Sequence, residues 1–531
     1  MNAHGIRNLR ARYVFPVLGP PIPDGLVSLA GDRIMAVGRR PISGPVEDLG
    51  SVALLPGLVN AHTQLEFSFL DRPIGQPGMA FSQWVRLVVE QFRSPASHNE
   101  KAEALPGASS LGGVREADWA TAGRASADSS RPAESRTAAG CPTGAAKTAP
   151  TAGTADGRTA TAGSPTGGGK TPGASRTAAG NTADGQAPDG RTAAGGTEGK
   201  AAEAIVRGLG ELIRTGTTAV ADIVPPGLPA HLWSQSGLKA AVFVELRAPT
   251  ARRVPLALQA AQQAISAWQT GTESSSAGGP DGGVQLGLSP HAPYTVRLEL
   301  LEAAIRLAQQ YRLPVAMHLA ESLEEIQLLH SGQGPLRRLL EELGQWEPGL
   351  VPAPCRPLDY LRQLAKVDRA LVIHGNYLDE EEWAFLAEHR QRMAVVFCPR
   401  SHAHFDHRPY PLREMLAWGL RVILGTDSRA SAPDTDMLAE LRWVATHFPQ
   451  LAPQRILELA TLEAAHALGW GEQLGALAPG RRADLVAVAL PDRQGTNDPY
   501  ELLLGSDLPV LAVWIAGQKV FPAREPASCP P

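Results

Sequence analysis

The chain has 531 residues with 49 basic and 53 acidic side chains, which gives a formal net charge of −4. A charge this mild for the length argues against a dedicated nucleic-acid binder, and no apolar stretch approaches the ~20 residues that a membrane-spanning helix needs. Four scattered cysteines (Cys141, Cys355, Cys398, Cys529) include no CxxC pair, which argues against a disulfide framework. We therefore expect a large cytoplasmic enzyme without a secretion signal, acting on a small molecule and binding neither nucleic acid nor membranes.

Both ends of the chain carry short segments typical of strands. Residues 1–52 include GLVSLAGDRIMAVG, and residues 478–525 include ADLVAVAL and VLAVWIAGQKVF. These segments are rich in β-branched residues and are interrupted by Gly or Pro. We predict that they pair into one small β-domain built from both termini.

Residues 94–200 differ in composition from everything around them. They consist largely of Ala, Gly, Thr, Ser and Pro, repeat the phrase RTAAG, and contain almost no large apolar side chains. Such a segment cannot bury enough surface to offset its ordering entropy. We predict a disordered low-complexity insertion between a helix near 81–92 and another near 201–214. A tether or partner-binding arm is the functional alternative.

The remaining residues, 53–93 and 201–477, repeat one unit, a short apolar run followed by a helical stretch. The runs occupy residues 53–61, 217–224, 240–246, 284–289, 314–318, 370–374, 393–398 and 421–425. Continuous apolarity is typical of parallel strands that are covered on both faces. Eight such units predict an α/β fold, specifically a (β/α)8 TIM-type barrel.

Polar residues gather where these runs end, which is where a barrel places its chemistry. The residues at or just after the run ends are His62, His291, His318, His374 and Asp427. Imidazole and carboxylate groups suit a single divalent metal, which lowers the pKa of a bound water to about 7. Glu321, three residues after His318, is placed to carry a proton, and His374 could accept one from the water.

Six phrases in the same order resemble the amidohydrolase superfamily, in particular its deaminase and chlorohydrolase branch. They are PGLVNAHTQLE (56–66), SPHAPYT (289–295), HLAES (318–322), HGNYL (374–378), CPRSH (398–402) and GTDSRAS (425–431). A further phrase, LGALAPGRRADLV (474–486), looks like the closing β-domain signature of the family. The phrases are most similar to deaminases of adenosine-like compounds, including aminodeoxyfutalosine and S-adenosylhomocysteine deaminases.

The resemblance implies a metal-dependent hydrolase acting on a non-peptide C–N bond. The expected reaction is deamination of an amino-substituted heteroaromatic or nucleoside-like substrate by metal-activated hydroxide. The resemblance implies that His62, His318 and Asp427 are metal ligands and that Glu321 is the proton shuttle. His374 would polarise or deprotonate the water, Asp427 would also accept a proton from it, and His291 would touch the substrate.

One position departs from the family pattern. The family has His-x-His after the first strand, whereas this chain has His62-Thr63-Gln64. We include Gln64 in the predicted ligand set, although its neutral amide oxygen is a poorer zinc ligand than imidazole. Gln64 could bind weakly or through water, or His374 could join the ligands. Alternatively the site has lost its metal, and the chain is a metal-free binding protein. We expect one zinc ion, with iron or manganese as alternatives.

Two other features stay open at this point. Arg429 should lie near the rim, where it could bind a substrate carboxylate or phosphate or pair with a carboxylate such as Asp434. His402 and His404, with His407 nearby, could form a second metal patch or a solvated loop. A hydrolase that expels halide or an amide amine is a further alternative to the deaminase, and a homodimer is compatible with the sequence.

Overall fold

The computed structural model describes residues 5–93, 191–274, 283–492 and 496–522. The predicted disorder of residues 94–190 lies outside this description. Residues 191–200, which we assigned to the insertion, are part of helix α2 (Arg191–Arg214), so this helix begins earlier than predicted. Within the described part of the chain, no helix is both long and apolar enough to cross a bilayer.

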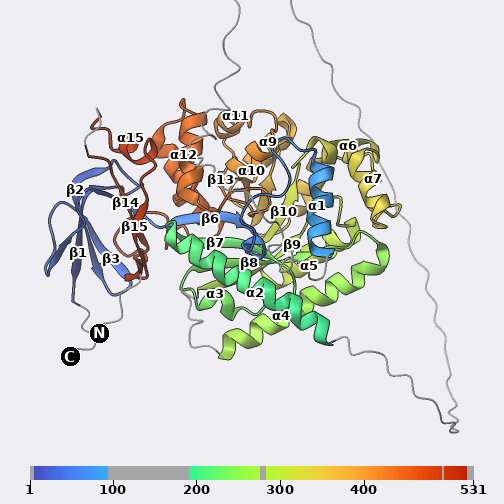
Figure 1. The fold of residues 1–531 in the computed structure, drawn as a ribbon, viewed down its shortest axis with the longest axis horizontal. Helices are drawn as coiled ribbons and strands as arrows, with labels where there is room; N and C mark the ends of the chain where they lie inside the picture. The colour runs from blue at the N-terminus through green and yellow to red at the C-terminus, as the bar shows by residue number, and fades with distance from the viewer. Residues whose placement is uncertain (1–4, 94–190, 275–282, 493–495, 523–531) are drawn as a thin grey trace, which may run out of the picture. The chain divides into compact units, whose positions relative to one another are not determined.

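Eight parallel strands form the predicted barrel and are hydrogen-bonded in chain order (Figure 1). They are β6 (Leu58–Thr63), β7 (Thr217–Val224), β8 (Lys239–Leu246), β9 (Val284–Pro290), β10 (Val315–Leu319), β11 (Ala370–His374), β12 (Met393–Phe397) and β13 (Val422–Leu424). Almost every residue on these strands is buried, as expected for a sheet with helices outside and a packed interior. The predicted (β/α)8 fold is confirmed.

The first and last barrel strands meet at the residues that matter most for chemistry. The backbone N–H groups of Thr426 and Asp427, just after β13, donate to the carbonyl oxygen of His62 at 3.2 and 3.1 Å. The Asn60 side chain donates to the Thr426 hydroxyl at 2.8 Å and accepts from the Thr426 N–H at 3.2 Å. The side chains that follow β13 are therefore brought next to those at the end of β6.

Helices follow most of the strands. The α-helices are α1 (Phe81–Arg93), α2 (Arg191–Arg214), α3 (His231–Ser234), α4 (Val254–Ser274), α5 (Leu298–Tyr311), α6 (Leu323–Ser331), α7 (Pro335–Glu342), α8 (Pro357–Leu364), α9 (Glu380–Glu388), α10 (Pro399–His404), α11 (Leu412–Ala417), α12 (Met437–His447), α13 (Pro453–Leu459), α14 (Leu462–Ala467) and α15 (Pro499–Leu504). Two 3-10 helices are η1 (Leu65–Phe67) and η2 (Ala251–Arg253).

A second sheet combines strands from both ends of the chain, as the blue and red strands of Figure 1 show. Its strands are β1 (Arg7–Val14), β2 (Ile22–Ala30), β3 (Arg33–Gly38), β4 (Val46–Asp48), β5 (Val52–Pro56), β14 (Leu485–Ala489), β15 (Val510–Ile515) and β16 (Gln518–Phe521). N-terminal β5 pairs antiparallel with C-terminal β14, which joins the two halves. The two end segments therefore share one sheet.

The first apolar run is not one strand, which corrects our prediction for residues 53–61. Its first half is β5 in the small sheet, and its second half is β6 in the barrel. Gly57 lies between them, and a Cβ there would collide with the Thr218 side chain. The missing side chain lets the backbone pass close to β7 as the chain changes sheets.

The barrel interior contains small apolar side chains such as Ala61, Ala221 and Ala241, together with Phe243. Trp470, which follows α14, belongs to the same buried cluster. Its ring lies 5.8 Å from the ammonium group of Lys239, the first residue of β8. The interior is thus filled by buried apolar side chains, and the histidines discussed below lie at or near the carboxyl ends of the strands.

Candidate active site

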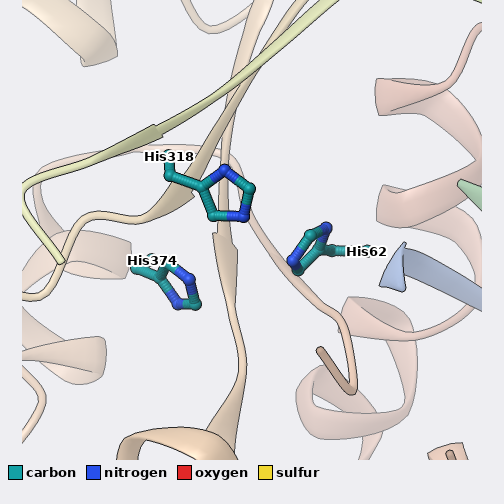
Figure 2. A group of neighbouring side chains, drawn as sticks. All are labelled: His62, His318 and His374. Atoms are coloured by element: carbon teal, nitrogen blue, oxygen red, sulfur yellow. The ribbon is translucent and has the colours of Figure 1, made fainter. Parts of the chain in front are cut away.

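Three of the predicted histidines meet at the carboxyl ends of their strands. His62 lies on β6, His318 on β10, and His374 is the last residue of β11. Figure 2 shows the three rings facing one another, and one nitrogen from each lies within 4.8 Å of the other two. Among the described residues, no other group of His, Cys, Asp and Glu side chains could hold a metal ion.

The chemistry of this group fits a divalent metal. The His62 residue is 1% exposed, yet neither ring nitrogen has a hydrogen-bond partner. An unsatisfied buried polar group costs about 1–3 kcal/mol, and a cation between the rings would remove that cost. Neutral imidazole is a preferred ligand of zinc and of several other divalent transition metals. The residues present therefore fit the metal that the family resemblance implies.

Asp427 lies beside this group and is held from several sides. Its Oδ1 lies 3.4 Å from Nε2 of His62. Its Oδ2 accepts hydrogen bonds from the hydroxyls of Ser401 and Ser431, both at 2.8 Å, and Oδ1 accepts one from the Ser428 N–H at 2.7 Å. Burial alone would raise the pKa of Asp427, but the interaction with His62 and the donated hydrogen bonds lower it below its usual value. Asp427 is therefore ionised.

Gly425 explains how Asp427 can come so close to β6. A Cβ at this position would lie 2.9 Å from both the Cβ and the backbone nitrogen of His62. Any larger residue would push the segment after β13 away from His62. The Gly in the GTDS phrase is thus required by this close approach.

Burial lowers the pKa values of two of these histidines, His318 and His374. Nδ1 of His318 lies 3.1 Å from the carbonyl oxygen of His291, which can only accept, so Nδ1 carries the hydrogen and Nε2 has the free lone pair. Burial lowers the pKa of His318 well below its usual value, and the neighbouring His62 and His374 lower it further. Burial also lowers the pKa of His374, to about 4. Neutral imidazole is the form that binds metal.

Glu321 is the carboxylic acid next to these rings. It is 6% exposed, and its Oε1 lies 3.4 Å from Nε2 of His374. Burial raises the pKa of Glu321 well above its usual value, and the charges of Asp427 and Glu325 raise it further. The site thus holds one carboxyl group whose pKa is raised, Glu321, and one whose pKa is lowered, Asp427. This is the arrangement by which a site separates a proton donor from a proton acceptor.

Glu325 holds the turn that carries Glu321, and sequence reasoning missed it. Its carboxylate accepts hydrogen bonds from the backbone N–H groups of Ala320 and Glu321, both at 2.9 Å. Glu325 is fully buried, and Ser322 caps the first turn of α6 by accepting from the Glu325 N–H. In sequence, Glu325 has the spacing of an ordinary capping-turn residue, so only the folded turn distinguishes it.

Asp222 holds the turn after His62 in a similar way, and it was also missed. It lies on β7 and is fully buried. Its Oδ1 accepts from the Thr63 hydroxyl and the Leu65 N–H, and its Oδ2 accepts from Nε1 of Trp233, each at 3.0 Å. Burial raises the pKa of Asp222 to about 7. An acidic residue within the apolar run TTAVADIV was the available signal.

Gln64 lies within this turn, directly after β6 and immediately before η1. It is half-buried, whereas His62, two residues earlier, is 1% exposed. Its backbone carbonyl accepts a hydrogen bond from the Phe67 N–H at 3.2 Å. The predicted ligand role of Gln64 stays a prediction.

His291, the predicted substrate contact, lies beside the metal-binding group. Its ring centroid is 5.0 Å from that of His318. Nδ1 of His291 lies 2.7 Å from the Thr295 hydroxyl, and Nε2 lies 3.7 Å from Oε1 of Glu245. The ring is thus oriented by neighbours at the ends of β8 and β9, at the same rim as the other histidines.

Charged residues beyond His291 were not predicted. Glu245, near the end of β8, forms an ion pair at 2.7 Å with Arg247, which directly follows the strand. Glu66 lies on η1, and burial together with the charge of Glu245 raises its pKa to about 8. Glu66 stands in the phrase PGLVNAHTQLE, but its charge could not be related to β8 without the fold.

Arg429 contacts a carboxylate that we did not name. Its Nε and one terminal nitrogen donate to the two carboxylate oxygens of Glu211 on α2 at 2.9–3.2 Å. Its other terminal nitrogen donates to the carbonyl oxygens of Leu70 and Pro433. Asp434, our suggested partner, pairs with Arg400 instead. These contacts connect Arg429 to α2 and to neighbouring loops, and its predicted substrate-binding role stays a prediction.

The second histidine patch forms no metal group within the described residues. Nδ1 of His402 lies 3.1 Å from Oδ1 of Asn376, and its Nε2 lies 3.0 Å from the Arg408 carbonyl oxygen. Nε2 of His404 lies 3.3 Å from the Ile74 carbonyl oxygen. These imidazoles hydrogen-bond to neighbouring loops. The suggestion of a second metal patch is therefore not supported.

Comparisons with known proteins agree with this architecture. A 5-methylthioadenosine/S-adenosylhomocysteine deaminase from Pyrococcus furiosus is 33% identical over 240 residues, which cover 43% of this chain and 52% of that protein. The chain thus spans about half the length of this curated relative.

Two solved structures share the fold. One is an adenosine deaminase from Xanthomonas campestris with bound zinc, with a TM-score of 0.59 and 21% identity over 97% of this chain and 92% of that one. The other is the aminofutalosine deaminase of Helicobacter pylori, with a TM-score of 0.66 and 16% identity over 97% and 100%.

The family model described as the amidohydrolase family matches residues 190–520, more than half of the chain. Together with the barrel and the histidines at its rim, this match assigns the chain. The protein belongs to the amidohydrolase family.

Proposed function

We propose that this chain is a metal-dependent deaminase that replaces the amino group of a nucleoside-like heteroaromatic ring with oxygen and releases ammonia. The observation that carries the proposal is the juxtaposition of three buried imidazoles with two carboxyl groups of opposite tendency, Glu321 with a raised pKa and Asp427 with a lowered one. Hydrolytic deamination needs both a proton donor and a proton acceptor at the reacting carbon. The activity of the named relatives supports the same reaction.

We propose that His62, His318 and Asp427 bind the metal, with either Gln64 or His374 as a further ligand. A divalent ion at this site lowers the pKa of water and so supplies hydroxide at neutral pH. We expect zinc because the donors are imidazole and carboxylate and because one structural neighbour holds zinc. Iron and manganese remain alternatives.

Side chains of this protein then accept and donate the protons that the reaction moves. Asp427, ionised beside His62, accepts the proton that the attacking water loses. Glu321 donates its proton to the ring nitrogen next to the amino-bearing carbon, which stabilises the addition of oxygen. The amino group leaves as ammonia after it receives the proton held by Asp427, and the added oxygen loses its remaining proton to Glu321, which restores both carboxyl groups. His291, at the same rim, contacts the ring and orients it.

The substrate class follows from the relatives. The Pyrococcus relative is named for 5-methylthioadenosine and S-adenosylhomocysteine, and a structural neighbour is named for aminofutalosine. We propose a substrate of this kind, an adenine ring on a modified ribose. A cytoplasmic location and a homodimer stay predictions.

The test is ammonia release by the full chain loaded with zinc, iron or manganese. The substrates are adenosine, 5-methylthioadenosine, S-adenosylhomocysteine and aminodeoxyfutalosine. We expect one ammonia for each substrate consumed, and none from Glu321→Gln with the same metal content. No ammonia from any substrate with any metal would overturn the proposal. Chloride release from a chlorotriazine under the same conditions would instead favour the halide-expelling alternative.

A further inference from the structure

We propose that His374, rather than Gln64, completes the metal-binding set of this chain. The ion is then bound by three imidazoles, those of His62, His318 and His374, in addition to the Asp427 carboxylate proposed above. This assignment rests on the proposed metal-dependent function and departs from the His-x-His pattern of the family.

The three imidazoles form the most compact set of candidate donors in the site. One nitrogen of each lies within 4.8 Å of the other two (Figure 2). Their ring centroids are 5.1, 5.5 and 5.9 Å apart. Asp427 approaches His62 but is not a member of this mutually close set. One ion between the rings can therefore contact all three imidazoles.

Burial separates His374 from Gln64. His374 is 3% exposed and faces the other two rings, whereas Gln64 is half-buried and keeps contact with solvent. The two nitrogens of His62 have no hydrogen-bond partner, although Gln64 is only two residues away. The His62 nitrogens that lack a partner thus lie beside the other two imidazole rings, one of which belongs to His374.

Ligand chemistry points the same way. An amide oxygen is neutral and hard, and transition metals such as zinc prefer imidazole nitrogen over it. Three imidazoles with an open position for water are an established catalytic zinc set. His62, His318 and His374 supply that set without any contribution from residue 64.

The backbone at His374 is consistent with a constrained functional position. His374 has a φ of 70°, in the left-handed region that a residue with a Cβ rarely adopts. The Tyr410 hydroxyl donates to its carbonyl oxygen at 3.1 Å, and this contact helps to hold the residue in place. Outliers of this kind cluster at sites where a side chain must be held in one position.

The direct test is X-ray absorption at the zinc edge of the full chain loaded with zinc, which counts coordinated imidazoles. We expect three imidazoles in the wild type and in Gln64→Ala, and two in His374→Asn. Two imidazoles in the wild type would overturn the assignment. This measurement on the wild type does not depend on how well any variant folds.

Zinc affinity, measured by competition with a chromophoric chelator, gives an independent readout. We expect His374→Asn to weaken zinc binding by at least about 100-fold, beyond the effect of changing an outer residue, and Gln64→Ala to change it by less than about threefold. The matched control is His402→Asn, which removes another buried histidine and should leave the affinity unchanged. Equal losses in Gln64→Ala and His374→Asn, or no loss in either, would overturn the assignment.

Ammonia release from the same samples separates this assignment from the proposed function. Three imidazoles without ammonia from any of the adenosine-like compounds would uphold the assignment and contradict the deaminase. Ammonia release by a wild-type protein whose zinc binds only two imidazoles would support the deaminase and contradict the assignment of His374.

Discussion

Two groups of histidines lie in this barrel domain, one on strand ends and one on or just after helix α10, and they differ in what their nitrogens contact. In the first group (His62, His318, His374), the nitrogens converge, and those of His62 have no hydrogen-bond partner. In the second group (His402, His404, His407), both nitrogens of His402 and one nitrogen each of His404 and His407 lie within hydrogen-bond distance of carbonyl, amide or hydroxyl groups, while Nε2 of His407 has no partner.

The difference shows that histidine density in a sequence does not identify a metal site. The second group is the denser one in sequence, with three histidines within residues 402–407. The first is spread over more than three hundred residues and is assembled by strand ends. Position at the carboxyl end of a barrel strand, rather than spacing along the chain, predicted which imidazoles meet.

The largest expected effect comes from Glu321, the acid beside the first group. Glu321→Gln keeps the shape but removes the proton, so kcat should fall by about 10²–10⁴-fold, the usual contribution of a general acid. Steady-state kinetics measure the fall, and metal analysis should show unchanged zinc content. The control is Glu341→Gln, which changes an exposed glutamate on α7. Activity close to wild type in Glu321→Gln would contradict the proton-shuttle role.

The second prediction concerns Asp222, which holds the turn after His62 by hydrogen bonds to Thr63 and Leu65. Its pKa is about 7 in the folded chain and about 4 when unfolded, so the folded state holds an extra proton between these values. The free energy of unfolding should therefore fall as pH rises from about 4 to 7, by at most about 4 kcal/mol from this group.

Denaturant unfolding across this pH range measures the effect. Asp222→Asn should flatten the dependence and also lower stability, because an amide nitrogen then faces the indole N–H of Trp233. A variant whose pH dependence matched that of the wild type would show that Asp222 does not bind the extra proton.

His402→Asn sharpens the contrast between the two groups. The substitution removes hydrogen bonds to Asn376 and Arg408 and should destabilise the fold by about 1–3 kcal/mol, without changing zinc affinity. His318→Asn should have the opposite profile, with zinc binding lost. Thermal unfolding of the chelator-treated proteins and zinc titration give the two readouts. Loss of zinc in both variants would mean that the groups are not functionally distinct.

The smallest expected effect concerns Arg429. Arg429→Gln breaks the partly buried ion pair with Glu211 and should destabilise the fold by about 1–3 kcal/mol, while kcat/KM should change by less than about threefold. Kinetics with S-adenosylhomocysteine, which carries a carboxylate, and 5-methylthioadenosine, which does not, form the comparison. A loss of about tenfold or more confined to the carboxylate-bearing substrate would support the predicted substrate-binding role of Arg429 instead.

The sequence predicted the parts of the structure that depend on local pattern. Continuous apolar runs located the eight barrel strands, and β-branched segments at both ends located the small sheet. The run at 53–61 was misassigned because β5 and β6 are both buried and apolar, and only Gly57 marks the change of sheet. The start of α2 was placed too late because its first turns have the composition of the insertion.

At the site, the residues at strand ends could be predicted from the sequence. The residues from other segments that hold them in place by hydrogen bonds or ion pairs could not. His62, His291, His318, His374 and Asp427 were found because strand ends converge in a barrel. Glu325 and Asp222 accept hydrogen bonds from backbone N–H groups of turns at the site. A residue in this role stands at no fixed distance in sequence from the turn that it holds. The Glu211 partner of Arg429 comes from a helix more than two hundred residues away, so no local rule could indicate it.

The most direct test of the account is a metal titration of ammonia release. The full chain is stripped with chelator and returned to zinc in steps, and the rate with 5-methylthioadenosine or another substrate found active is measured at each step. The account predicts no activity without metal and a linear rise that ends near one zinc per chain, with no rise in Glu321→Gln. Activity that is independent of added metal, or one that appears with metal in Glu321→Gln, would contradict it.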